Sequence, residues 1–195
     1  MTPRPRRARL YSHRSALMAF LLFGCQTTPL DVLEISGAGG NGQTCAKAPA
    51  PLAGSYRIRS VSSGKCLGIG TNITVGNLPA RLTAMVNDCS NQGEIFQLIP
   101  DGGFGSFQLR ATSIDDNVDI EMLGTDDGTR AIYFAPNGLK NQRFTFSQRR
   151  DAVFALVPAH APLSCLADVL PQPEIYTCRS DQTNQDWELL PASCD

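Results

Sequence analysis

One short ending occurs three times in this chain: Glu94-Ile-Phe96-Gln-Leu98, Gln142-Arg-Phe144-Thr-Phe146 and Gln185-Asp-Trp187-Glu-Leu189. The central aromatic residues of these endings are 48 and 43 residues apart. A pattern that returns with a period of about 20 to 50 residues is typical of a protein built from structural repeats. The sequence therefore predicts three repeats between Gly54 and Pro191.

Short strand-like runs within each repeat alternate with turns that contain Gly, Asn and Asp. Examples are Ser55–Ser60, Ser106–Arg110 and Ala152–Val157. Such runs are typical of strands separated by turns, and no segment has the periodicity of an amphipathic helix. We therefore expect an all-β fold. A closed barrel is favoured because three sets of short strands must hide their edges.

The endings, together with Lys65-Cys66-Leu67, resemble the Gln-x-Trp repeats of the ricin-B lectin family. The third ending matches fully, the second has Phe in place of Trp, and the first is a degenerate copy. The resemblance covers about 140 of the 195 residues. It implies a β-trefoil lectin domain over residues 53–195. It also implies that the aromatic residues of the three endings belong to the core.

In that family each repeat can hold a shallow sugar site made of a carboxylate, an aromatic ring and the Asn before Gln-x-Trp. The first repeat has Gly68, Asn87 and Gly93 at these positions, so we expect no site there. The other repeats keep more of the set. The resemblance assigns carbohydrate binding to Glu121, Phe134, Asn141 and Gln142 in the second repeat and to Asp168, Tyr176, Asn184 and Gln185 in the third.

Both assignments depart from the family pattern. Glu121 reaches the carboxylate position only if two extra residues are allowed, with Asp119 at the place of the repeat's first Cys. Asp168 comes one residue late, because Ala167 holds the expected position. The alternatives are ordinary ones: Asn residues in turns, aromatic residues half-buried in strands and solvated acids. A fold alone does not fix a function.

Residues 1–24 have the pattern of an export signal. Five arginines and no acidic residue occur in this segment, and the apolar run 16–24 ends it. Nine residues are too few to span a bilayer, which takes about 20, but they suit a signal peptide. Leu22-Phe23-Gly24-Cys25 resembles the bacterial lipobox, which implies lipid attachment to Cys25. The alternative is an ordinary cleaved signal.

Residues 25–52 are expected to form a flexible linker, because they are rich in Gly and Pro and lack apolar periodicity. Gln26 follows the lipid acceptor instead of the Asp that favours inner-membrane retention. We therefore expect an exported protein, anchored to the cell envelope by its lipid at the outer membrane.

The chain has seven cysteines, and an exported protein is expected to pair an even number of them. Lipidation of one would leave six. The family plan implies two bridges within repeats, and the last two cysteines lie at the two ends of the domain. The expected pairs are Cys66–Cys89, Cys165–Cys178 and Cys45–Cys194. Because no Cys-x-x-Cys occurs, we expect no zinc site.

Charge and chemistry make several functions unlikely for this chain. Without the five N-terminal arginines, 12 basic residues face 18 acidic ones, a net charge of about −6 that disfavours nucleic acid. The one histidine after the signal, His160, has no nucleophile-base pattern around it, so we expect no catalysis and no cofactor. Asp115, Asn117 and Asp119 alternate as in a calcium loop, but Ile120 replaces the required Gly, so we expect an acidic turn and no metal.

A second family offers an alternative function. A lipobox, a linker and a trefoil in this order resemble the A-type subunit of cytolethal distending toxins, and Asp88-Cys89-Ser90 followed by Glu94–Pro100 is in that style. This resemblance implies a delivery or assembly subunit that contacts a protein partner as well as a cell surface. Carbohydrate binding is the favoured interpretation.

Overall fold

The computed structural model describes residues 48, 50–87, 89–90, 93–101 and 105–193. The expected signal peptide, Cys25, Cys45 and Cys194 lie outside these ranges. Within the described ranges, no helix has the length and apolar character needed to cross a membrane.

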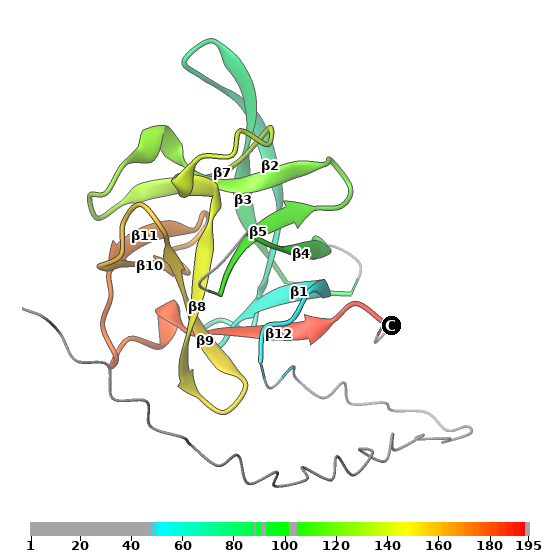
Figure 1. Ribbon diagram of the computed structural model, residues 1–195, viewed down its shortest axis with the longest axis vertical. Coiled ribbons are helices and arrows are strands. Elements are labelled where there is room, and N and C mark those ends of the chain that lie inside the picture. Colours follow the sequence, from blue (N-terminus) through cyan, green and yellow to red (C-terminus); the bar gives the residue numbers. More distant parts are fainter. Residues whose placement is uncertain (1–47, 49, 88, 91–92, 102–104, 194–195) are drawn as a thin grey trace, which may run out of the picture. The chain divides into compact units, whose positions relative to one another are not determined.

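The described residues form twelve strands and three single-turn helices, which divide into three repeats of four strands (Figure 1). The first repeat contains β1 (Gly54–Ser60), β2 (Cys66–Val75), β3 (Leu78–Val86) and β4 (Phe96–Pro100). The second contains β5 (Ser106–Ala111), β6 (Asp116–Ile120), η1 (Glu121–Leu123), β7 (Thr129–Phe134), η2 (Lys140–Gln142) and β8 (Phe144–Arg150). The third contains β9 (Val153–Pro158), β10 (Ser164–Ala167), β11 (Glu174–Thr177), η3 (Thr183–Gln185) and β12 (Trp187–Pro191).

Six of these strands close into an antiparallel barrel. Strand β1 pairs with β4, β4 with β5, β5 with β8, β8 with β9, β9 with β12, and β12 returns to β1. Closure gives each of these strands a partner on both sides and so removes exposed sheet edges. The barrel confirms the predicted all-β architecture.

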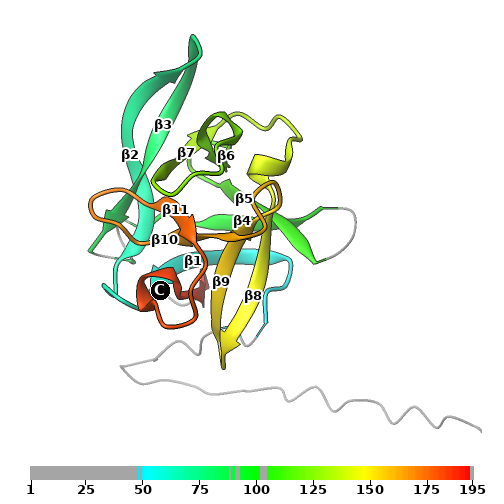
Figure 2. The ribbon, with the colours of Figure 1, turned by 90° about the vertical axis from the view of Figure 1, so that its left-hand side faces the viewer.

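The other six strands form three hairpins, β2–β3, β6–β7 and β10–β11. Strand β7 also pairs with β3 and with β11, which gathers the three hairpins together. A six-stranded barrel with three such hairpins is a β-trefoil, as the ricin-B resemblance implied. The β2–β3 hairpin is the longest, with strands of 10 and 9 residues, and it projects beyond the rest of the domain (Figures 1 and 2).

The aromatic residue of each repeated ending begins the last strand of its repeat and is fully buried. Phe96, Phe144 and Trp187 all have 0% exposure. The Trp187 indole donates a hydrogen bond of 2.9 Å to the carbonyl of Leu166, and the ring of Phe96 stacks on Tyr133 with centroids 6.3 Å apart. Burying one such side chain stabilises the fold by about 1.5–3 kcal/mol. These aromatic residues are core residues, as expected.

Two disulfides tie the hairpins of the first and third repeats. They join Cys66 to Cys89 and Cys165 to Cys178, the two pairs that the family plan implied. The middle repeat has an amide instead of a bridge. Asn117 lies opposite Phe134, as Cys165 lies opposite Tyr176.

The Asn117 side chain is fully buried and makes hydrogen bonds within the middle repeat. Its Nδ2 donates to Oε1 of Gln108 at 3.0 Å and to Oε1 of Gln142 at 3.1 Å. A buried amide is tolerated only when its polar atoms have partners. This pair of contacts links the hairpin to the repeated ending where the other repeats use a disulfide.

Candidate functional site

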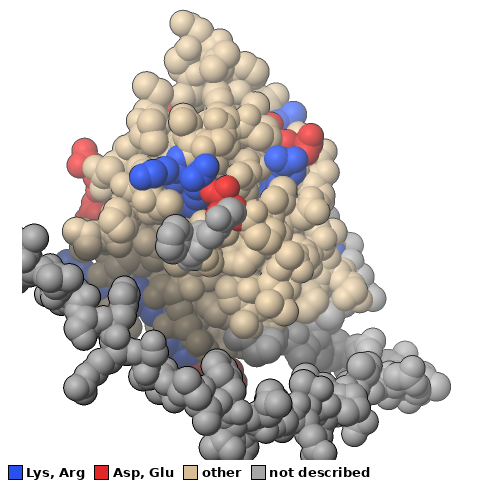
Figure 3. All heavy atoms as spheres, viewed as in Figure 1, with Lys and Arg blue, Asp and Glu red and all other residues tan. Residues whose placement is uncertain are grey.

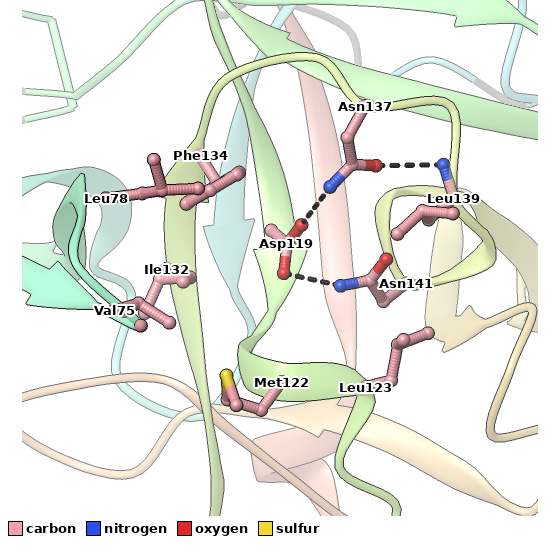
Figure 4. Close-up of a pocket in the computed structure, with 11 residues that line it drawn as sticks. Val75, Leu78, Asp119, Met122, Leu123, Ile132, Phe134, Asn137, Leu139 and Asn141 are labelled. Atoms are coloured by element: carbon pink, nitrogen blue, oxygen red, sulfur yellow. Dashed lines mark hydrogen bonds between the residues drawn. The ribbon is translucent and has the colours of Figure 1, made fainter.

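A pocket of about 300 Å³ opens beside the hairpin of the middle repeat (Figure 4). Its walls come from the β6–β7 hairpin, from η1 and the loop into η2, and from the tip of the β2–β3 hairpin. Three polar side chains, Asp119, Asn137 and Asn141, face seven apolar ones. The pocket is therefore formed by two different repeats.

Asp119 lies near the end of β6 and is only 3% exposed. Its Oδ1 accepts a hydrogen bond of 2.6 Å from Nδ2 of Asn141. Its Oδ2 accepts from Nε2 of Gln142 at 2.9 Å and from Nδ2 of Asn137 at 3.3 Å. Three amides thus fix the orientation of one carboxylate at the wall of the pocket.

Burial raises the pKa of the Asp119 carboxyl from 3.8 to about 6, and the amide donors of Gln142, Asn137 and Asn141 oppose that rise. The group is therefore ionised at neutral pH. A carboxylate offers about four acceptor positions, and the three amides occupy three of them. One position remains for a donor from a ligand.

Asn141 supplies a buried amide oxygen that lacks a donor among the described residues. Its Nδ2 donates to Asp119 and, at 3.0 Å, to the carbonyl of Ile120, which fixes the orientation of the amide. Its Oδ1 points away from Asp119 (Figure 4) and accepts no hydrogen bond from any described residue. A buried amide oxygen without a donor costs about 1–3 kcal/mol, so a ligand donor here would be favourable.

Phe134 and Ile132 form the apolar wall on β7, across the pocket from Asn141 (Figure 4). Met122 and Leu123 of η1 border the pocket on another side. Their φ angles are 55° and 57°, in the left-handed region that bulky residues rarely adopt. Strained conformations of this kind cluster at functional sites.

The structure brings together two of the four residues predicted for the middle repeat. Phe134 and Asn141 line the pocket. Gln142 lies behind it, fully buried, where its Nε2 donates to Asp119 and, at 3.0 Å, to the carbonyl of Ala135. Gln142 is therefore a positioning residue and not part of the pocket wall.

The fourth residue, Glu121, lies outside the pocket, and Asp119 holds the carboxylate position instead. Both Glu121 oxygens accept hydrogen bonds from the Arg130 guanidinium, at 2.5 and 2.6 Å. The structural register shows that the middle repeat contains no insertion at this point, because Asn117 occupies the place of the first Cys. Aligning Asn117-Val118-Asp119 with Cys66-Leu67-Gly68 would have found the residue that sequence reasoning missed.

A second pocket, of about 220 Å³, lies in the third repeat. Tyr176, Asn184 and Gln185 line it, as predicted for a site there. Gln185 resembles Gln142 in its contacts: its Nε2 donates to the carbonyl of Thr177 at 3.0 Å and its Oε1 accepts from the Arg179 amide at 2.8 Å. The hydroxyl of Tyr176 donates to Glu174 at 2.9 Å, which raises the pKa of Tyr176.

The carboxylate of the third-repeat pocket is Asp127 and not Asp168. Asp127 accepts hydrogen bonds from the backbone amide and hydroxyl of Thr177, at 2.6 and 3.1 Å. Asp168 is 8% exposed and does not line the pocket, and its carboxylate accepts no hydrogen bond from any described residue. In the third-repeat pocket, Oδ1 of Asp127 is thus engaged by Thr177, and Oδ2 accepts no hydrogen bond from any described residue.

The first repeat is closed to a site of this kind. Gly68 provides no carboxylate, and Gly93 stands where the other repeats have Asn. A Cβ at Gly93 would lie 2.6 Å from the carbonyl oxygen of Cys89, so no larger residue fits without a shift of the backbone.

The chain has the β-trefoil fold, and solved structures with this fold resemble it. ThreeFoil, a designed 3-fold symmetric protein, matches with a TM-score of 0.57 and 23% identity over 70% of this chain and 97% of its own. The Polyporus squamosus lectin, bound to the epitope Neu5Acα2-6Galβ1-4GlcNAc, matches with a TM-score of 0.57 and 18% identity over 72% of this chain. An exo-β-1,3-galactanase from Clostridium thermocellum matches with a TM-score of 0.61 and 20% identity over 72% of this chain.

No protein-family model matches the sequence, and no curated protein matches it. The chain spans 49% of the length of the lectin and 31% of the length of the galactanase. At these identities the similarity establishes the fold alone.

Proposed function

We propose that the middle-repeat pocket binds carbohydrate. The observation that carries this proposal is the oriented carboxylate of Asp119 at the pocket wall, beside the buried Oδ1 of Asn141, which has no donor among the described residues. Neighbouring hydroxyls of a sugar ring can donate to both at once. The ring of Phe134 offers an apolar surface to the C–H face of the same sugar.

The charge of the pocket favours a neutral sugar. Among the described residues that line it, none is Lys, Arg or His. Asp119 is ionised above about pH 6 and would repel a carboxylate or phosphate on the ligand. A hydroxyl-rich, uncharged ring fits these conditions best.

A glycan array tests this proposal, with the purified chain and two variants of similar chemistry. We expect the wild type to retain at least one class of neutral glycans. Asp119→Asn should lose that signal, since the amide cannot replace the charged acceptor, and Glu121→Gln should keep it. No binding by the wild type, or equal binding by Asp119→Asn, contradicts the proposal.

The third-repeat pocket is a second, weaker candidate within this proposal. Tyr176 and Asn184 support it, but the predicted carboxylate Asp168 does not line it, and Asp127, which does, comes from the second repeat. Any binding that remains in Asp119→Asn should be removed by Asn184→Ala. If no binding remains in that variant, the middle repeat is the sole site.

We further infer that Cys25 carries a lipid and holds the domain at the outer membrane. The lipobox-like segment before Cys25 supports this inference, and so do the two disulfides, which leave three of the seven cysteines unassigned. Intact-mass measurement of the exported chain should show acylation at Cys25. A free thiol there would refute the anchor.

The proposed activity is binding without turnover. Glycoside hydrolysis generally uses two carboxyl groups, and Asp119 is the one carboxylate among the described residues of the pocket wall. Release of reducing sugar from a bound glycan would contradict this. The resemblance to toxin subunits supports a second function, delivery with a protein partner, which a stable complex with a neighbouring nuclease-like gene product would favour.

A further inference from the structure

The mouth of the middle-repeat pocket is lined by exposed apolar side chains. Leu78 is 54% exposed, Met122 73%, Leu123 46% and Leu139 48%. These are four of the seven exposed large apolar residues in the described part of the chain. Single exposed apolar residues are ordinary, but a cluster around one pocket marks a binding surface.

Two separate elements build this apolar rim. The tip of the β2–β3 hairpin, where Val75 pairs with Leu78, forms one side. On the other side, Met122 and Leu123 take left-handed backbone conformations and remain at the surface. Figure 4 shows the two groups around the carboxylate of Asp119. The rim is thus a built feature of the pocket.

The rim carries no charge that would suit an ionic ligand. Residues 66–80, which include the whole projecting part of the hairpin, contain no Lys, Arg, Asp or Glu. On the face seen in Figure 3, the projecting part shows neither blue nor red side chains. The projecting part of the hairpin therefore offers a ligand no ionic contact.

We propose that the ligand is a neutral sugar joined to an apolar aglycone. The sugar hydroxyls face Asp119 and Asn141, and the aglycone lies along Leu78, Met122 and Leu123. Four large side chains present more apolar surface than a substituent such as an acetyl methyl would cover. The inference rests on the proposed function, because the same pocket must hold the sugar. Membrane glycolipids and soluble alkyl or aryl glycosides share this chemistry.

Matched glycosides test the inference by calorimetry with the purified chain. The probes are octyl and methyl β-glycosides of glucose, galactose, mannose and N-acetylglucosamine, used below the micelle concentration, with 1-octanol as the sugar-free probe. For any sugar that binds, the octyl form should bind about tenfold or more tightly than the methyl form, since it buries extra methylene groups.

Variants show whether that difference arises at the rim. Met122→Ser and Leu123→Ser should reduce the octyl preference, the ratio of octyl-glycoside to methyl-glycoside affinity, to about threefold or less. Leu163→Ser is the control, because Leu163 is 79% exposed and does not line the pocket. Leu163→Ser should keep the full preference for the octyl over the methyl glycoside.

The outcomes separate the two proposals. Equal affinity for octyl and methyl forms, with both lost in Asp119→Asn, overturns the aglycone and leaves sugar binding in place. Octyl-glycoside binding that persists in Asp119→Asn and extends to 1-octanol overturns both proposals. Failure to bind any of the probes also overturns both.

Phosphatidylcholine vesicles with and without a glycosylceramide distinguish the two sources of such a ligand. Binding only to vesicles that contain the glycosylceramide indicates a membrane glycolipid, and binding of octyl glycosides alone indicates a soluble glycoside. Both results support the inference.

Discussion

Asp119 is a buried carboxylate whose surroundings act on its proton in opposite directions. Removal from water favours the neutral acid, while the amides of Gln142, Asn137 and Asn141 and the electrostatic effect of His160 favour the anion. Burial has the larger effect, so the pKa rises to about 6. The residue is thus ionised at neutral pH at a cost to the stability of the fold.

That cost predicts a pH dependence of stability. The folded pKa of Asp119 is about 6, above the unfolded value of about 3.9. The contribution of Asp119 to the free energy of unfolding is therefore fully present below about pH 3.9. It is lost as the pH rises through about 6. Relative to Asp119→Asn, the wild type should lose up to about 3 kcal/mol of unfolding free energy between pH 4 and pH 7. Urea denaturation at several pH values measures this, and parallel curves for the two proteins would contradict it.

Gly93 gives a prediction about the closed first repeat. A Cβ there would meet the Cys89 carbonyl at 2.6 Å. We expect Gly93→Ala to lower the unfolding free energy by about 1–3 kcal/mol, the usual cost of overpacking, despite the small gain from a stiffer unfolded chain. Thermal denaturation measures the change. Unaltered stability would mean that the backbone near Cys89 shifts easily and that position 93 has room for the Asn found in the other repeats.

At the scale of elements, the strands were predictable and the hairpin register was not. The expected strand 106–110 is β5, Ser106–Ala111, because alternation and flanking turn residues mark a strand locally. The alignment of the middle repeat failed by two residues because Asn117 replaces a cysteine, and no local pattern shows that equivalence. The contribution of the β2–β3 tip to the pocket was also hidden, since it depends on contacts between repeats.

The amide that replaces a disulfide has a testable energetic role. Asn117→Ala removes the hydrogen bonds that its amide donates to Gln108 and Gln142, while Oε1 of Gln142 keeps its donor from the Asn137 backbone amide at 3.0 Å. We expect a loss of about 1–2 kcal/mol in unfolding free energy for the two lost hydrogen bonds. Urea denaturation measures the loss, and Gln97→Ala, at an exposed position of β4, is the control. A loss no greater than that of the control would show that the network contributes little.

For the whole molecule, the described residues bring the two ends of the domain together. The backbone amide of Ala48 donates to the carbonyl of Leu189 at 3.1 Å, on the last strand of the barrel. Cys45 precedes Ala48 by three residues, and Cys194 follows Leu189 by five. Both cysteines lie outside the described residues, and the bridge between them stays a prediction.

Non-reducing peptide mapping should find a peptide that joins Cys45 to Cys194. The entropy model gives a stabilisation of about 4–5 kcal/mol for closing so long a loop. A Cys45→Ser, Cys194→Ser double variant should therefore melt at a lower temperature. Free thiols at both positions in the exported protein would rule the bridge out.

The central claim is that the middle-repeat pocket, with Asp119 as its acceptor, is what the trefoil uses to bind a neutral sugar. Isothermal titration of a glycan selected by the array into the wild type, Asp119→Asn and Glu121→Gln tests it most directly. The account predicts a loss of about tenfold or more in affinity for Asp119→Asn, the cost of one charged hydrogen bond, and no change for Glu121→Gln. Full affinity in Asp119→Asn, or a loss confined to Glu121→Gln, would contradict it.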